Sequence, residues 1–174
     1  KSIETCCFHK GALIPSNVLK EYEYDKRYLL KNHNFSIVST NKLEKIYNHI
    51  KLYLDNMQNF KNHVIDKELE NFWFDFAKDN IENIKLLVLN IEKDLAYSVL
   101  YGIKDDTIYL INYAFNVKYK KYAPGKILLT FLMEKYSANY NVDYSRGLDS
   151  YKIRFGCLVN NNVKFLYPAN RKLT

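Results

Sequence analysis

Three apolar runs follow one another in the middle of the chain, and short polar turns separate them. The runs are Ile84–Glu92, Leu95–Ile103 and Thr107–Phe115, and the turns are Lys93-Asp94 and Lys104–Asp106. The runs are rich in Leu, Ile, Val and Tyr, and turns this short join strands that lie antiparallel and side by side. The sequence therefore predicts an antiparallel meander, and this feature limits the possible folds more than any other.

A helix with a distinctive start follows the meander. Apolar residues between Ile127 and Leu132 recur at helical spacing and predict a helix over Lys126–Ala138. The Pro124-Gly125 turn before it leaves backbone N–H groups at the positive end of the helix dipole. Such an end attracts anions, so the turn is a candidate phosphate site.

Spacing patterns predict further elements on both sides of this region. They are a strand over Phe35–Ser39, a helix from Thr40 or Asn41 to about Leu54, a helix over Lys67–Asn80, a strand over Asn141–Ser145, a helical turn over Tyr151–Phe155 and a strand over Val163–Tyr167. Residues 1–24 show little periodicity and begin at Lys1, so we expect a lead-in or the edge of a fragment. Residues 25–174 are then expected to form one domain of the α/β (α+β) class.

The net charge of +7 raises the question of an anionic partner. Of the 26 basic residues, four are arginines, at positions 27, 146, 154 and 171. Lysine is the poorer residue for bidentate recognition of phosphates and bases, so a solvated basic surface is favoured over nucleic-acid binding. Both interpretations stay open on composition alone.

Neither a metal site nor a membrane span is expected. Cys6, Cys7 and His9 would make half of a zinc site, but no second pair at ligand spacing completes it. No apolar run approaches the roughly 20 residues that a membrane-spanning helix needs. Because the sequence shows no secretory signal pattern either, we expect a cytoplasmic protein.

Two signatures after the meander point to a known family. The first is Tyr119-Lys-Lys-Tyr-Ala-Pro-Gly125, and the second is Asp143-Tyr-Ser-Arg-Gly147 followed by Tyr151-Lys152 and Phe155-Gly156. In this order they resemble the FemAB-like branch of the GNAT acyltransferases, and more narrowly the acetyltransferase domain of proteins associated with bacterial cellulose biosynthesis. The match spans about Ile84–Gly156, and the turn has one glycine where the usual Gln/Arg-x-x-Gly-x-Gly/Ala loop has more.

The resemblance implies a GNAT-like mixed, mostly antiparallel twisted sheet that is flanked by helices and opens to hold acetyl-CoA or another acyl-CoA. The strand Thr107–Phe115 would lie along the pantetheine arm, and its N–H groups would stabilise the oxyanion that forms at the thioester. The residues that would bind the pyrophosphate are Tyr122, Ala123, Pro124, Gly125 and Lys126. The implied activity is N-acyl transfer, in particular acetyl transfer, to an amine-bearing small molecule or polymer.

The resemblance also brings candidate side chains to the reaction. Attack by an amine needs a base for its proton and an acid for the departing group. The candidates for this chemistry are Asp143, Tyr113 and Lys152, and those for binding the acceptor are Arg146, Asp149 and Tyr151. A structural explanation stands beside them, since Asp143 can pair with Arg146 and Asp149 can cap the helical turn.

Two other functions stay open from the sequence. One is a Fem-like transferase that uses an aminoacyl-tRNA, which is the one case with a nucleic-acid partner and for which the basic charge would serve. The other is a GNAT-shaped binding module without catalysis, which the single glycine of the turn would suit. Stabilisation by CoA thioesters, by tRNA or by neither would separate the three functions.

Overall fold

The computed structural model describes residues 2–146 and 150–163 of the 174-residue chain. A seven-stranded sheet in the order β2-β3-β4-β5-β6-β1-β7 forms its centre. The strands are β1 (Ser2–Phe8), β2 (Phe35–Thr40), β3 (Ile84–Ile91), β4 (Asp94–Lys104), β5 (Thr107–Phe115), β6 (Asn141–Arg146) and β7 (Leu158–Val163). The helices are α1 (Ser16–Asn32), α2 (Leu43–Lys61), α3 (Lys67–Asp79), the 3-10 helix η1 (Val117–Tyr122), α4 (Pro124–Tyr136) and α5 (Ser150–Arg154).

The sheet is mixed and mostly antiparallel, as the family resemblance implies. Five of its six described pairings are antiparallel, and the pairing of β5 with β6 is parallel. The predicted meander is present as β3, β4 and β5, with each strand end within one residue of its expected place. Glu92 and Asp105 lie in the two turns with φ of 54° each, a conformation that tight hairpin turns require.

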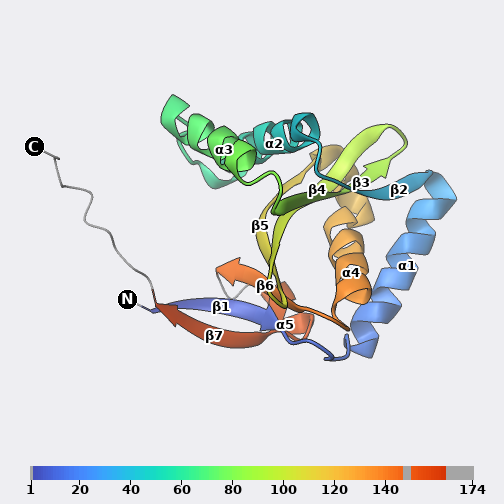
Figure 1. Ribbon diagram of the computed structural model, residues 1–174. Helices are drawn as coiled ribbons and strands as arrows, with labels where there is room; N and C mark the ends of the chain where they lie inside the picture. The colour runs from blue at the N-terminus through green and yellow to red at the C-terminus, as the bar shows by residue number, and fades with distance from the viewer. Residues whose placement is uncertain (1, 147–149, 164–174) are drawn as a thin grey trace, which may run out of the picture.

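Helices cover both faces of the sheet, as Figure 1 shows: α2 and α3 lie on one face, and α1 and α4 on the other. On the first face, Ile46, Ile50 and Leu54 of α2 pack against strand residues such as Leu86 and Leu100. These three helical residues recur at intervals of four positions, and this spacing is the pattern that predicted the helix. Each face of the sheet therefore has its own apolar core.

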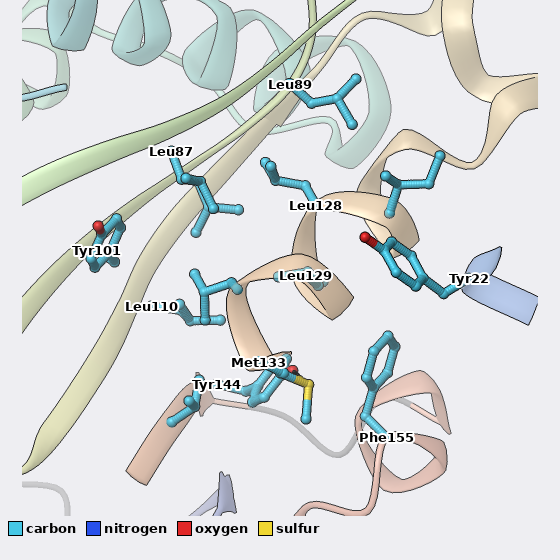
Figure 2. Close-up of a cluster of buried hydrophobic side chains, with 14 of the residues drawn as sticks. Tyr22, Leu87, Leu89, Tyr101, Leu110, Leu128, Leu129, Met133, Tyr144 and Phe155 are labelled. Carbon is cyan, nitrogen blue, oxygen red and sulfur yellow. Dashed lines mark hydrogen bonds between the residues drawn. The ribbon is translucent and has the colours of Figure 1, made fainter. Parts of the chain in front are cut away.

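Helix α4 lies between the sheet and α1. Figure 2 shows Leu87 and Leu110 of the sheet facing Leu128 and Leu129 of α4, with Tyr22 of α1 on the other side of the helix. Leu128 is fully buried, and seven of the thirteen residues of α4 are buried. This explains why α4 is apolar on most of its surface.

The N-terminal segment differs from the expectation for residues 1–24. Strand β1 pairs with both β6 and β7, and α1 runs through the position where the sequence divides residues 1–24 from the domain. The reason for the missed strand is burial on both faces, because Cys6, Cys7 and Phe8 are all buried and so show no alternation. Helix α1 buries Val18, Tyr22 and Leu29, a stripe too narrow to stand out among its charged residues.

Several element bounds also shift, and α2 runs to Lys61 rather than to about Leu54. Helix α4 begins at Pro124 rather than at Lys126, because proline is well suited to the first helical position. The last described strand is Leu158–Val163, an edge strand paired with β1, whereas the predicted strand was Val163–Tyr167. The rest of that predicted range, 164–167, lies outside the described residues.

Candidate functional site

The parallel strands β5 and β6 separate in the middle of the sheet. Their pairing runs from Thr107 opposite Asn141 to Tyr109 opposite Asp143. Beyond this point β5 continues along β4 and β6 continues along β1, where Arg146 lies opposite Thr5. A gap therefore opens between neighbouring strands at the centre of the domain.

A polar contact closes the narrow end of this gap. Ser145 has a φ of 59°, and its Oγ donates to the carbonyl oxygen of Leu110 at 2.5 Å. The Oδ1 of Asp143 accepts from the Ser145 N–H at 2.6 Å and holds this turn of the backbone. The side chain of Ser145 thus links β6 to β5 just beyond the last residue pair of their ladder.

Strand β5 carries a β-bulge in its pairing with β4, next to the gap. Leu100 lies opposite Asn112 and Tyr101 lies opposite Leu110, which leaves Ile111 as the extra residue. A bulge turns backbone groups out of the regular ladder, so it can aim an N–H at a ligand. At the far end, Asn56 of α2 accepts from the Phe115 N–H at 2.8 Å and donates to its carbonyl at 3.1 Å. The side chains of Ser145 and Asn56 therefore mark the two ends of the unpaired edge of β5.

Two cavities of about 840 Å³ and about 260 Å³ meet at the gap. The larger cavity reaches the α2 and α3 side, where Tyr53 and Trp73 line it. The smaller one lies on the side of α1 and α4. Tyr113, Leu129 and Tyr151 line both cavities. A ligand in one cavity would therefore share these three side chains with a ligand in the other.

Tyr113 is the predicted catalytic residue that the structure places most clearly in the gap. Its ring stacks on Tyr97 of β4 with centroids 6.0 Å apart and planes 11° apart. The ammonium of Lys61 lies 5.7 Å from the centroid of the Tyr113 ring. Burial raises the pKa of Tyr97 well above its ordinary value, so Tyr97 stays neutral and serves as a packing partner.

The other candidate residues for catalysis and acceptor binding lie in different places. Lys152 is buried and lines the larger cavity together with Tyr151. Asp143 holds the Ser145 turn instead, and neither cavity has it in its lining. Arg146 ends β6, its side chain lies outside what the structure describes, and Asp149 falls in the segment 147–149 that is likewise outside.

The predicted pyrophosphate turn is brought only partly to the smaller cavity. Gly125 and Lys126 line that cavity. Tyr122 is buried elsewhere, where its hydroxyl lies 2.9 Å from Nε2 of His33. Ala123 is the N-cap of α4 with a φ of 49°, and Pro124 is the buried first residue of the helix.

Carboxylates of α1 lie against the basic residue of this turn. The Nζ of Lys126 lies 2.6 Å from Oδ2 of Asp25 and 3.2 Å from Oε2 of Glu21. Glu21 also contacts Arg154 of α5. A Cβ on Gly125 would lie 2.8 Å from Cε2 of Tyr97, so this glycine is explained by a ring that packs on it. The Lys126 ammonium at this turn is therefore paired with two carboxylates of α1.

The close packing at Gly125 gives a first prediction. Gly125→Ala should lower the free energy of unfolding by about 1–3 kcal/mol, because the new methyl group meets the Tyr97 ring. Urea denaturation measures this cost. Gly102→Ala is the matched control, since its Cβ would meet Asn83 at an ordinary 3.5 Å. An equal cost in a Tyr97→Leu background would contradict the role given to the ring.

A buried polar cluster beside the gap was not predicted from the sequence. The imidazole of His49 lies between Ser98 and Asn112, with Nδ1 2.7 Å from the Ser98 Oγ and Nε2 2.6 Å from the Asn112 Oδ1. Burial lowers the pKa of His49 to about 4 against the effect of the Asn112 hydrogen bond, so the ring is neutral. Asn112 also lines the larger cavity. The one signal in the sequence is a histidine between Ile46 and Ile50 on an apolar helix face.

The cysteines and other possible metal ligands form no site in the described part of the chain. Cys6, Cys7 and Cys157 are buried, and burial raises the pKa of Cys157 to about 12, which keeps it a thiol. Among residues 2–146 and 150–163, no group of three His, Cys, Asp or Glu side chains could hold a metal ion. Within the same ranges, no helix has the length and apolar character to cross a membrane.

Comparisons with known proteins show what the chain is similar to. No protein-family model and no curated protein matches it. Among solved structures, it is similar to the C-terminal domain of a putative lysylphosphatidylglycerol synthetase from Agrobacterium fabrum, with a TM-score of 0.64 and 10% identity over 92% of this chain and 59% of that one. It is also similar to FemX, with a TM-score of 0.62 and 8% identity over 90% of this chain and 59% of that one.

A third similar structure is an aminoglycoside acetyltransferase from an uncultured soil metagenomic sample, in complex with sisomicin. Its TM-score is 0.52 and its identity 18%, over 78% of this chain and 97% of that one. The chain thus spans less than two thirds of the first two structures and nearly all of the third. These likenesses establish the fold alone. It is the GNAT-like fold that the resemblance implies, seen here as an open, mostly antiparallel seven-stranded sheet flanked by helices.

Proposed function

We propose that this chain is an N-acyltransferase that moves an acyl group onto an amine in the gap between β5 and β6. The observation that carries the proposal is the separation of these strands beyond Tyr109 and Asp143, with two cavities that share Tyr113, Leu129 and Tyr151. A donor can approach from one face of the sheet and an acceptor from the other. The similar fold of an aminoglycoside acetyltransferase and of FemX supports this proposal.

The bulged segment of β5 would stabilise the negative charge that forms during the transfer. When the amine nitrogen bonds to the acyl carbon, the carbonyl oxygen gains negative charge. Backbone N–H groups next to Ile111 are fixed before the reaction and can donate to that oxygen. The bond from the acyl carbon to the leaving group then breaks, and the amine proton passes to a base.

The side chains around the gap divide these tasks. Tyr113 would move the proton, directly or through a water, because its ring lies between the two cavities. Lys152 and Tyr151 would bind the acceptor and the departing group, and Asp143 would hold the Ser145 turn. Arg146 and Asp149 follow that turn in the sequence and are kept as proposed acceptor contacts.

The larger cavity is where we place the acceptor. It has about 840 Å³ of space, and both aromatic and basic side chains line it. Tyr53 and Trp73 of α2 and α3 offer flat apolar surfaces, and Lys61 and Lys152 offer ammonium groups. The acceptor would be an amine-bearing small molecule or the end of a polymer that reaches the gap from this side.

Two donor classes remain, and one observation favours the second. The resemblance implies acetyl-CoA or another acyl-CoA, but Lys126 already pairs with Glu21 and Asp25. This pairing favours a donor that needs no diphosphate contact there, such as the aminoacyl ester of a tRNA. The net charge of +7 would help to bind tRNA.

Turnover with defined donors tests the proposed function. The protein is incubated with a pool of amines and with acetyl-CoA, S-acetylpantetheine or aminoacyl-tRNA, and acylated products are detected by mass spectrometry. We expect products with at least one donor. A folded protein that gives none with all three would contradict the proposal and favour a binding module.

A further inference from the structure

We infer that the mouth of the smaller cavity binds no phosphate group of the donor, because carboxylates of α1 already neutralise the cations there. The inference deepens the proposed function and relies on it for the acyl donor. It assigns to Glu21 and Asp25 a role in donor selection. The donor class is an activated acyl compound whose arm is uncharged where it passes α4.

The ion pairs at this mouth form one connected group. Lys126 of α4 contacts both Asp25 and Glu21, at 2.6 Å and 3.2 Å between nitrogen and oxygen. The second oxygen of Glu21 contacts the guanidinium of Arg154. Two cations and two carboxylates sum to zero charge. A pyrophosphate would have to compete with both carboxylates for Lys126 and with Glu21 for Arg154.

The packing of α1 places these two carboxylate residues beside α4. Val18, Tyr22 and Leu29 of α1 are buried, and Figure 2 shows Tyr22 against α4. The side chain of Asp25 is 18% exposed and that of Glu21 is 33% exposed, so water screens the contacts incompletely.

The rest of the mouth is apolar or aromatic. Tyr97, Leu129, Tyr151 and Phe155 line the smaller cavity between the ion pairs and the gap. The Tyr97 ring covers the open side of Gly125, where a phosphate could approach the backbone, because Cε2 of that ring lies 2.8 Å from the position that a Cβ would take. An uncharged arm fits this lining better than a polyanion does.

Binding of inorganic pyrophosphate tests the inference without any acyl donor. Titration calorimetry at low salt compares the wild type with Glu21→Gln/Asp25→Asn. The double variant leaves Lys126, Arg154 and the start of α4 without carboxylates, so we expect it to bind pyrophosphate about tenfold more tightly than the wild type, or better. Equal affinity of the two proteins would overturn the inference.

The matched control is Glu23→Gln/Asp55→Asn, which makes the same change in net charge at exposed positions away from the mouth. This control should bind pyrophosphate as weakly as the wild type. A gain in the control as large as in the double variant would also overturn the inference. Adding Lys126→Met to the double variant should abolish the gain, and circular dichroism confirms that each variant is folded.

Donor turnover then separates this inference from the proposed function. If the wild type uses thioester donors, its kcat/KM values for acetyl-CoA and S-acetylpantetheine should lie within about threefold of each other, since the phosphates add no contact. A preference of tenfold or more for acetyl-CoA would overturn the inference and leave the acyltransferase proposal intact. If neither thioester is used, that donor class fails, while the pyrophosphate titration still decides the role of Glu21 and Asp25.

Discussion

Acidification from pH 7 to pH 4 should lower the free energy of unfolding by about 3 kcal/mol through His49 alone. Burial lowers the pKa of His49 to about 4 in the folded protein, whereas an unfolded chain has an ordinary value near 6.5. Between these two values the unfolded chain binds a proton that the folded protein does not. The stabilisation is therefore complete above about pH 6.5 and is lost as the pH falls towards 4.

Urea denaturation at several pH values measures this effect. His49→Gln removes the titrating ring, so the variant should be less stable at pH 7 and should lose most of the slope between pH 6.5 and pH 4. His9→Gln is the control, because His9 is exposed and should leave the slope unchanged. An unaltered slope in His49→Gln would show that another group governs acid stability.

Tyr113→Phe should reduce kcat by about 100-fold or more, which is the usual size of a lost proton-transfer group. Phenylalanine keeps the ring that stacks on Tyr97 and lies near Lys61, so the melting temperature should change little. The rate is measured with whichever donor supports turnover. The loss should appear in kcat rather than in KM, since the hydroxyl acts in the transition state.

Tyr109→Phe is the matched control for that experiment. Tyr109 is on the same strand and is 42% exposed, much as Tyr113 is at 39%, but it lies where β5 and β6 are still paired. Its variant should keep the wild-type rate. A Tyr113→Phe rate within about threefold of the wild type would exclude this hydroxyl and leave Lys152 as the remaining candidate at the gap.

The local parts of the fold could be predicted from the sequence. Strands β3, β4 and β5 are neighbours in the chain and in the sheet, so their pattern and their short turns contain nearly all the information needed. Strand β1 is different, because its partners β6 and β7 lie more than 130 residues away. Its residues Cys6, Cys7 and Phe8 are buried on both faces, and this removes the alternation that reveals a strand.

The candidate site was harder to predict because its contacts are long-range. The sequence places Lys126 at the start of a helix, but Glu21 lies 105 residues earlier in the chain, and no spacing rule connects the two. Asn112 lies 63 residues from His49 for the same reason. Tyr113 and Tyr151 could be proposed from their motifs, yet only the separation of β5 from β6 brings them to one gap.

The location of a bound acceptor tests the central claim most directly. Methyl NMR can follow a titration with the amine acceptor that supports turnover, because Val99, Leu110, Ile111 and Leu129 line the larger cavity. We predict that their signals shift together and saturably. The signals of Ile46 and Ile50, on the buried face of α2, should not shift. Saturable binding that leaves the four cavity methyl groups unshifted would contradict transfer between β5 and β6.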